Sequence, residues 1–394
     1  MKEYYEIVDV LAREIINSKA EPALEVEVTL DDGTVGIASV PSPELGGSCD
    51  AGELCGSGIS LAVANVNIEI TEALLGLNAL DQTSIDGMLK DIDGTPGTSR
   101  LGANAVLGAS LAVCRAAALA TGQSLYNYIG GINAKVMPVP MFGLLGGMAG
   151  DSMTLRDIQL VPTGAETFKE AVHMCSEIYR DFTGTVRTRA PFSRNEDALE
   201  AVVTAAEAAG YSAGEDYYLS LDMAASVKGN NLNAEEIADM LESLADKYPV
   251  ACIEVGNGTG GSDGLKKLKE RFGSRMLITA GDMFAPGSGN TGAYKTGAVN
   301  SVLLMLDNFS TVTDLADAVN NVHRSGCAAI IGTSSGETED TAIADIAVAL
   351  NTGLIKLNAP GTGNSTKLNQ LLRIAEELFD AARYAGAGAF PFPV

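Results

Sequence analysis

Six apolar runs in the C-terminal part of the chain each end in a polar residue, and this recurrence constrains the fold more than any other feature. Helical hydrophobic patterns separate the runs, as expected for buried parallel strands that alternate with covering helices. Such units close into an α/β barrel, and barrels of this class carry their sites at the carboxyl ends of the strands. We therefore expect six residues to meet on one face: Asp222, Glu254, Asp282, Asp307, Thr333 and Lys356.

The N-terminal part of the chain has a different pattern, in which strands come first and helices follow. The predicted strands are residues 4–8, 24–30 and 35–41, and the predicted helices are about 59–75, 79–91 and 103–120. Asp31-Asp32-Gly33 has the residue types of a hairpin turn. Strands followed by a run of helices indicate an α+β domain. We predict two domains, at 1–133 and 134–394, since 394 residues that are 46% hydrophobic can bury two cores.

Charge and composition exclude several classes of partner. The 26 basic and 50 acidic residues give a net charge of −24, which argues against binding to nucleic acid or to an anionic membrane surface. No run of eighteen apolar residues occurs, so no membrane span is predicted. The N-terminus lacks a secretory pattern, and the six cysteines are dispersed without CxxC pairs. We predict a cytoplasmic protein with reduced thiols.

The densest set of motifs lies within residues 333–378. A Gly/Ser turn precedes one helical pattern, and a short apolar strand at 354–357 carries Lys356 at its end. The loop at 358–361 breaks this strand before a second amphipathic helix, which runs from about Thr366 to Leu378. A lysine at the tip of a barrel strand is either a site residue or a side chain that extends from the strand end into solvent.

This region closely resembles the C-terminal part of the enolases, the glycolytic lyases that dehydrate 2-phosphoglycerate. The shared motifs there are SGETEDT (335–341), IAD (343–345), IK (355–356), AP (359–360) and KLNQLLRI (367–374). Further motifs are AREI (12–15), EVEV (25–28), AVANVN (62–67), LGANAVLGASLA (101–112) and LYNYIGG (125–131). The resemblance implies an α/β fold, with an enolase-like (β/α)8-type barrel, an irregular first hairpin and an N-terminal α+β cap domain. It also implies a homodimer through the cap, with residues 14–17 in the contact.

The resemblance further implies a magnesium site made of three carboxylates at strand ends, because Mg²⁺ prefers oxygen ligands in octahedral geometry. Asp222 and Glu254 match the first two ligands. Gly281 occupies the third position, and a one-residue shift that restored Asp282 would point it to the wrong side of a strand. We therefore predict weak or absent magnesium binding. Alternatively, Asp222 and Glu254 bond to the backbone or to Lys356.

The residues that transfer protons in the family are largely replaced. The base lysine aligns with Met305, which cannot accept a proton. Lys356 matches the second active-site lysine, which binds the substrate carboxylate; it acts as a base if desolvation lowers its pKa, or else pairs with the acidic strand ends. Asp157 aligns with the glutamate of the QEF motif and is one methylene shorter. The family's GDEGGFAP segment corresponds to residues 182–191, which contain no carboxylate.

The anion site is also changed. The family motif SHRSGET corresponds here to residues 332–338, where Ser335 is retained and the arginine that grips phosphate is missing. Thr333, Ser334 and Ser335 precede a predicted helix, so their backbone N–H groups are candidates for binding a small anion. The alternative is ordinary N-capping by Ser334 or Ser335.

These replacements concentrate at the site, whereas the core and turn motifs are retained. We predict an enolase-like protein without normal 2-phosphoglycerate dehydratase activity, which has a binding, assembly or regulatory role as a homo-oligomer or with a protein partner. One alternative is a diverged lyase or racemase-like enzyme in which Asp222, Glu254 and Lys356, with Asp157 or Asp282, act on another carboxylate substrate. A further alternative is a residual enolase reaction at a low rate.

Overall fold

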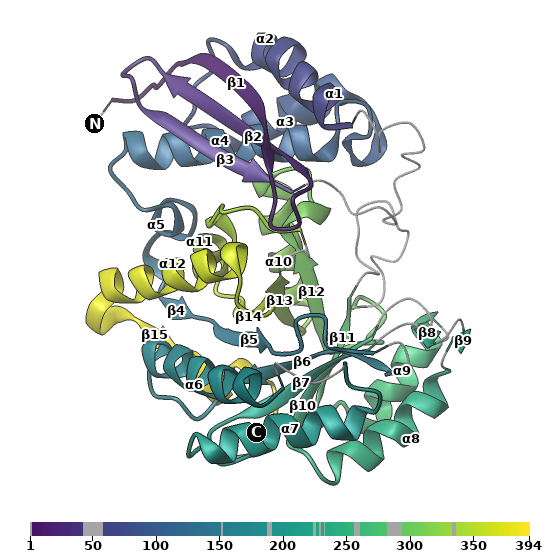
Figure 1. Cartoon of the computed structure of the whole chain (residues 1–394). Helices are drawn as coiled ribbons and strands as arrows, with labels where there is room; N and C mark the ends of the chain where they lie inside the picture. Colours follow the sequence, from purple (N-terminus) through teal and green to yellow (C-terminus); the bar gives the residue numbers. More distant parts are fainter. Residues whose placement is uncertain are drawn as a thin grey trace.

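A computed structural model shows a small N-terminal α+β domain above an eight-stranded closed barrel (Figure 1). The structure describes residues 2–41, 58–150, 153–186, 191–223, 226–227, 230–231, 233–255, 261–281, 294–332 and 336–394. The predicted α/β architecture, a barrel with an N-terminal cap, is confirmed. The predicted division at residues 133 and 134 falls between a short 3₁₀ turn (Gly131–Asn133) and the strand β4.

The strands are β1 (Ile7–Ile16), β2 (Pro22–Leu30), β3 (Val35–Val40), β4 (Val136–Met137), β5 (Val139–Gly143), β6 (Leu155–Val161), β7 (Tyr218–Met223), β8 (Ser226–Val227), β9 (Asn230–Asn231), β10 (Val250–Val255), β11 (Leu277–Ala280), β12 (Ser301–Met305), β13 (Ala328–Gly332), β14 (Gly353–Leu357) and β15 (Arg383–Tyr384). The helices are α1 (Gly58–Asn65), α2 (Thr71–Leu74), α3 (Gln82–Asp93), α4 (Ala103–Ala120), α5 (Leu125–Gly130), α6 (Phe168–Val186), α7 (Asn195–Ala208), α8 (Ala234–Ala245), α9 (Gly261–Phe272), α10 (Val312–Arg324), α11 (Ala342–Ala349) and α12 (Thr362–Leu378). A π-helical turn (Val66–Ile70) joins α1 to α2.

The N-terminal sheet is antiparallel in the order β1-β2-β3, and its first strand differs from the prediction. Residues 4–8 were predicted as the strand, but β1 starts at Ile7 and continues to Ile16, because its partner β2 offers a pairing edge along that whole length. The backbone N–H of Tyr5 instead donates to Asn78 Oδ1. The predicted hairpin is confirmed: Gly33, at φ +87°, lies in the turn between β2 and β3.

Helix α4 covers the inner face of this sheet at close range. A Cβ atom at Gly36 would lie 2.2 Å from the carbonyl oxygen of Ala112, so the approach of β3 to α4 requires glycine. By length and composition alone α4 is apolar enough to cross a membrane, but 78% of it is buried inside the protein. It is therefore the core helix of the N-terminal domain.

The barrel has the order β10-β11-β12-β13-β14-β5-β6-β7 and closes on itself. Strand β6 is antiparallel to both β5 and β7, whereas the other neighbouring pairs are parallel. The irregular first hairpin that the resemblance implied is thus confirmed. Because β6 is antiparallel to its neighbours, its N-terminal end lies at the same rim as the C-terminal ends of the parallel strands.

Ion pairs and hydrogen bonds fasten the cap to the barrel. Arg115 on α4 makes a bidentate ion pair with Asp340, with both N···O distances at 2.9 Å. The same carboxylate accepts the backbone N–H groups of Ser39 (2.9 Å) and Ala342 (2.7 Å), so it joins β3 to the start of α11. Asp340 therefore accepts the N–H group of the first residue of α11 and lies at the centre of the contact between the two domains.

Candidate functional site

Three of the predicted strand-end residues meet at one rim of the barrel. Lys356 on β14 places its Nζ atom 2.8 Å from Asp222 Oδ2 on β7 and 2.5 Å from Glu254 Oε2 on β10. All three are buried: their side chains are 9%, 11% and 4% exposed, respectively. The strand order brings them together because the parallel strands end at the same rim.

A fourth residue, Arg156, reaches the same carboxylates from the opposite side. Its Nε and Nη2 atoms lie 2.9 and 2.8 Å from Asp222 Oδ1, and Nη2 lies 3.9 Å from Glu254 Oε1. In the pairing of β6 with β7, Leu155 is opposite Met223 and Asp157 is opposite Asp222, so Arg156 is an extra, bulged residue. A bulge redirects a side chain, which explains how Arg156 and Asp157 both face this rim.

Each of the four carboxylate oxygens of Asp222 and Glu254 therefore has a cation beside it. Burial opposes ionisation, but Lys356 and Arg156 outweigh it and lower the pKa of Asp222 below its ordinary value. Burial is the largest influence on Glu254 and raises its pKa to about 7 in spite of Lys356. Burial also disfavours a charged Lys356, yet the two carboxylates raise the pKa of its ammonium group above the ordinary value. Lys356 consequently stays protonated at neutral pH.

This arrangement does not fit the three-carboxylate magnesium site that the resemblance implied. Cations of the protein itself contact the oxygens of Asp222 and Glu254. At the third position, a Cβ atom on Gly281 would lie 2.6 Å from Glu254 Oε1, so the glutamate leans into the space that a ligand side chain would need. Asp282 lies outside the described residues. Among the described residues, no three His, Cys, Asp or Glu side chains are grouped in a way that could hold a metal ion.

The remaining catalytic candidates are not part of this cluster of ion pairs. Asp157 accepts a hydrogen bond from the backbone N–H of Leu145 at 2.9 Å, and burial raises its pKa to about 6. Met305 ends β12 and packs against the apolar interior of the barrel. It is separated from Lys356 by Gly332 of β13, which pairs with both. Thr333, Ser334 and Ser335, the candidate anion site, lie outside the described residues.

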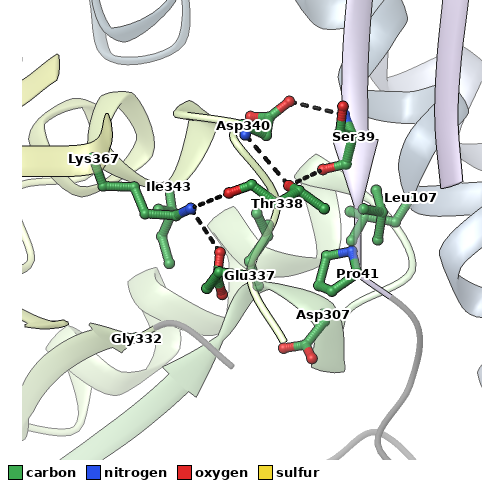
Figure 2. Close-up of a pocket in the computed structure, with 12 residues that line it drawn as sticks. Ser39, Pro41, Leu107, Asp307, Gly332, Glu337, Thr338, Asp340, Ile343 and Lys367 are labelled. Atoms are coloured by element: carbon green, nitrogen blue, oxygen red, sulfur yellow. Dashed lines mark hydrogen bonds and ion pairs between the residues drawn. The ribbon is translucent and has the colours of Figure 1, made fainter. Parts of the chain in front are cut away.

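A small pocket lies where the cap meets the barrel (Figure 2). Its free volume is about 20 Å³, which is room for about one water molecule. Lys367 enters from α12, makes a 2.7 Å ion pair with Glu337 and donates to the carbonyl oxygen of Thr338 at 2.9 Å. The pocket is lined by Ser39, Val40, Pro41, Leu107, Leu306, Asp307, Gly332, Glu337, Thr338, Asp340, Ile343 and Lys367. Its buried lysine and glutamate neutralise each other.

Residues of the SGETEDT and KLNQLLRI segments have structural roles around this pocket. Glu337 pairs with Lys367, so the first motif is attached to α12. Asp340 pairs with Arg115, so the same motif is attached to the cap. These residues therefore hold the cap, the barrel rim and α12 together.

Arg156 is the site residue that sequence reasoning missed. In a regular strand it would point away from Asp157, its neighbour. The charge of Arg156 could have indicated its role. It is a cationic residue next to Asp157, near a rim that was expected to carry several carboxylates.

Comparison with protein families agrees with this architecture. Residues 7–129 match the family model for the enolase N-terminal domain. Residues 134–391 match the model for the enolase C-terminal TIM barrel domain. The two matches follow one another and together span the cap and the barrel, including the rim that carries Asp222, Glu254 and Lys356. The chain therefore belongs to the enolase family.

Proposed function

We propose that this enolase-family protein does not carry out normal dehydration of 2-phosphoglycerate and serves instead in binding, assembly or regulation. One observation carries the proposal: the ammonium group of Lys356 is held by two buried carboxylates. A general base must be deprotonated near the working pH. Lys356 has a raised pKa, so it is a poor base, and its ammonium group donates hydrogen bonds to two acids of the protein, Asp222 and Glu254.

The other positions support the same conclusion. Met305 has no group that accepts a proton, and it stands where the family has its base. We propose that magnesium binding is weak or absent, because an ion would have to displace Arg156 or Lys356 from Asp222 and Glu254. A diverged lyase that used these three residues on another carboxylate would first have to break the same ion pairs.

We further propose a cytoplasmic homo-oligomer, most simply a dimer through the cap, with domains at 1–133 and 134–394. Family membership supports an oligomer. The strand β1 at the edge of the cap sheet exposes Val8, Leu11 and Ile16, and residues 14–17 fall within the same region. A sedimentation mass equal to one chain at micromolar concentration would contradict the dimer.

Restoring the third carboxylate with Gly281→Asp is not expected to create a tight magnesium site. The new Cβ atom would overlap Glu254 Oε1, at 2.6 Å, and would push away a carboxylate that the ion needs. We expect calorimetric titration with Mg²⁺ to give the same weak or undetectable signal for the variant and the unaltered protein. Gly281→Ala is the matched control, since it adds the Cβ atom without the carboxylate. Tight one-to-one binding by Gly281→Asp would show that Glu254 moves aside easily.

The test of the proposed function is turnover of 2-phosphoglycerate with excess Mg²⁺, followed by the absorbance of the enol product. Loss of a positioned general base alone typically costs about 10² to 10⁴ in rate, so we expect no turnover above background. Met305→Lys should rescue little, because the neighbouring proton-transfer and phosphate-binding residues are also replaced. Measurable turnover by the unaltered protein that disappears in Lys356→Ala would overturn the proposal.

A further inference from the structure

We propose that Arg156 is a tethered counter-ion that occupies the place of a divalent cation between Asp222 and Glu254, so that removing its guanidinium group opens a binding site for Mg²⁺ or Mn²⁺. This inference rests on the proposed function, in that it takes the carboxylate pair to be unavailable to metal in the unaltered protein. Arg156 is the one side chain that we hold responsible for keeping a metal ion away from Asp222 and Glu254.

Lys356 and Arg156 contact different oxygens of the two carboxylates. Lys356 contacts Asp222 Oδ2 and Glu254 Oε2, whereas Arg156 contacts Asp222 Oδ1 and lies 3.9 Å from Glu254 Oε1. Each cation thus bridges both carboxylates through a different pair of oxygens. Bridging two carboxylates through one oxygen each is also what a hard divalent cation does.

The charge balance explains why a metal ion is excluded. When both carboxylates are ionised they carry a formal charge of −2, which the +2 of the lysine and the arginine balances. A divalent ion that entered this cluster would face two fixed cations within a few ångströms. Without Arg156, the carboxylates would retain an uncompensated negative charge and two oxygens without a cation, which favours uptake of an ion.

The two cations differ in their access to solvent. The Lys356 side chain is only 9% exposed, whereas that of Arg156 is 44% exposed and covers the outer side of the pair. An ion that replaced Arg156 could therefore enter from solvent and keep water ligands, as Mg²⁺ prefers. The bulge in β6 supplies this outer cation without changing the carboxylates themselves.

The experiment titrates metal-free, full-length protein with Mn²⁺ alone, and free Mn²⁺ is counted by electron paramagnetic resonance. The unaltered protein is compared with Arg156→Gln, Arg156→Lys and the double variant Arg156→Gln/Asp222→Asn. We expect Arg156→Gln to bind one equivalent at least about tenfold more tightly than the unaltered protein, since a unit charge at close range no longer repels the ion. Arg156→Lys, which keeps the charge, and the double variant, which removes a ligand, should bind as weakly as the unaltered protein.

Two results would overturn the inference. One is a folded Arg156→Gln protein, judged by circular dichroism, that gains no affinity for Mn²⁺. The other needs no variant: a rise of several degrees in the melting temperature of the unaltered protein with Mn²⁺, relative to chelator, would show that Arg156 does not block the site. Neither result depends on turnover, so the inference can fail while the proposed function stands.

Discussion

Replacing Lys356 by methionine is expected to lower the free energy of unfolding by about 3–5 kcal/mol near neutral pH, as is typical when one partner of a buried ion pair is removed. Methionine keeps most of the apolar length of the side chain, so the loss comes mainly from the charge. Asp222 and Glu254 would remain buried with only Arg156 to compensate them. The urea midpoint, measured by circular dichroism, reports the change.

The loss of stability in Lys356→Met should be larger at high pH than at low pH. In the unaltered protein the pKa of Glu254 is raised to about 7, so its contribution to stability is fully present below the ordinary carboxyl pKa and is lost as the pH rises towards 7. Without the lysine, the pKa of Glu254 should rise further, and the pKa of Asp222 should lose part of its lowering. The deficit of Lys356→Met is therefore expected to be largest near pH 7.5 and to shrink towards pH 5, where Glu254 takes up a proton.

Two further variants test this explanation. Lys90→Met removes a lysine from an exposed ion pair with Asp314 and should cost at most about 1 kcal/mol. Adding Asp222→Asn to Lys356→Met should recover part of the loss, because one uncompensated charge is removed. A loss in Lys356→Met that is independent of pH, or that Asp222→Asn fails to reduce, would mean that packing rather than charge is responsible.

Replacing Arg115 by methionine is expected to cost a similar amount, about 3–5 kcal/mol, and to loosen the junction between cap and barrel. Asp340 would be left buried without its bidentate partner while still accepting the N–H groups of Ser39 and Ala342. Hydrogen exchange should locate the effect, since the Ser39 amide loses protection when its acceptor moves.

The matched control for this variant is Arg100→Met. Arg100 also forms an ion pair from the cap, with Glu69, but both side chains are more than 40% exposed. Exposed pairs contribute roughly 0–1 kcal/mol, so this variant should stay close to the unaltered protein. Equal losses in the two arginine variants, or unchanged exchange at Ser39 in Arg115→Met, would contradict the role assigned to Asp340.

Sequence patterns predicted the barrel and much of the rim, because both follow from local rules. Apolar runs with polar ends identified β7, β10 and β14, and the rule that parallel strands end together predicted that Asp222, Glu254 and Lys356 meet. The ion pair of Lys356 with the acidic strand ends was one of the stated alternatives. It depends only on opposite charges that are brought to the same rim.

The features that sequence could not supply depend on pairing between distant segments. Strand β1 begins at Ile7 rather than residue 4 because its register with β2 determines where the ladder starts. Arg156 faces Asp222 because a bulge forms against β7, whose carboxylate is 66 positions further along the chain. Period-two alternation within β6 gives the opposite orientation for this side chain. The carboxylate of Glu254 likewise lies close to Gly281 only because β10 and β11 pair side by side.

The closure of the barrel between β14 and β5 has a consequence for synthesis of the chain. Leu357 of β14 pairs with Phe142 of β5, so the last strand of the barrel completes the first. The cap sheet pairs neighbouring strands and can fold while the ribosome is still translating the barrel. Until β14 emerges, β5 and β13 remain the open edges of an incomplete sheet. A ribosome that stalls in this interval holds a folded cap attached to two unpaired strand edges, the state in which a nascent chain most needs a chaperone.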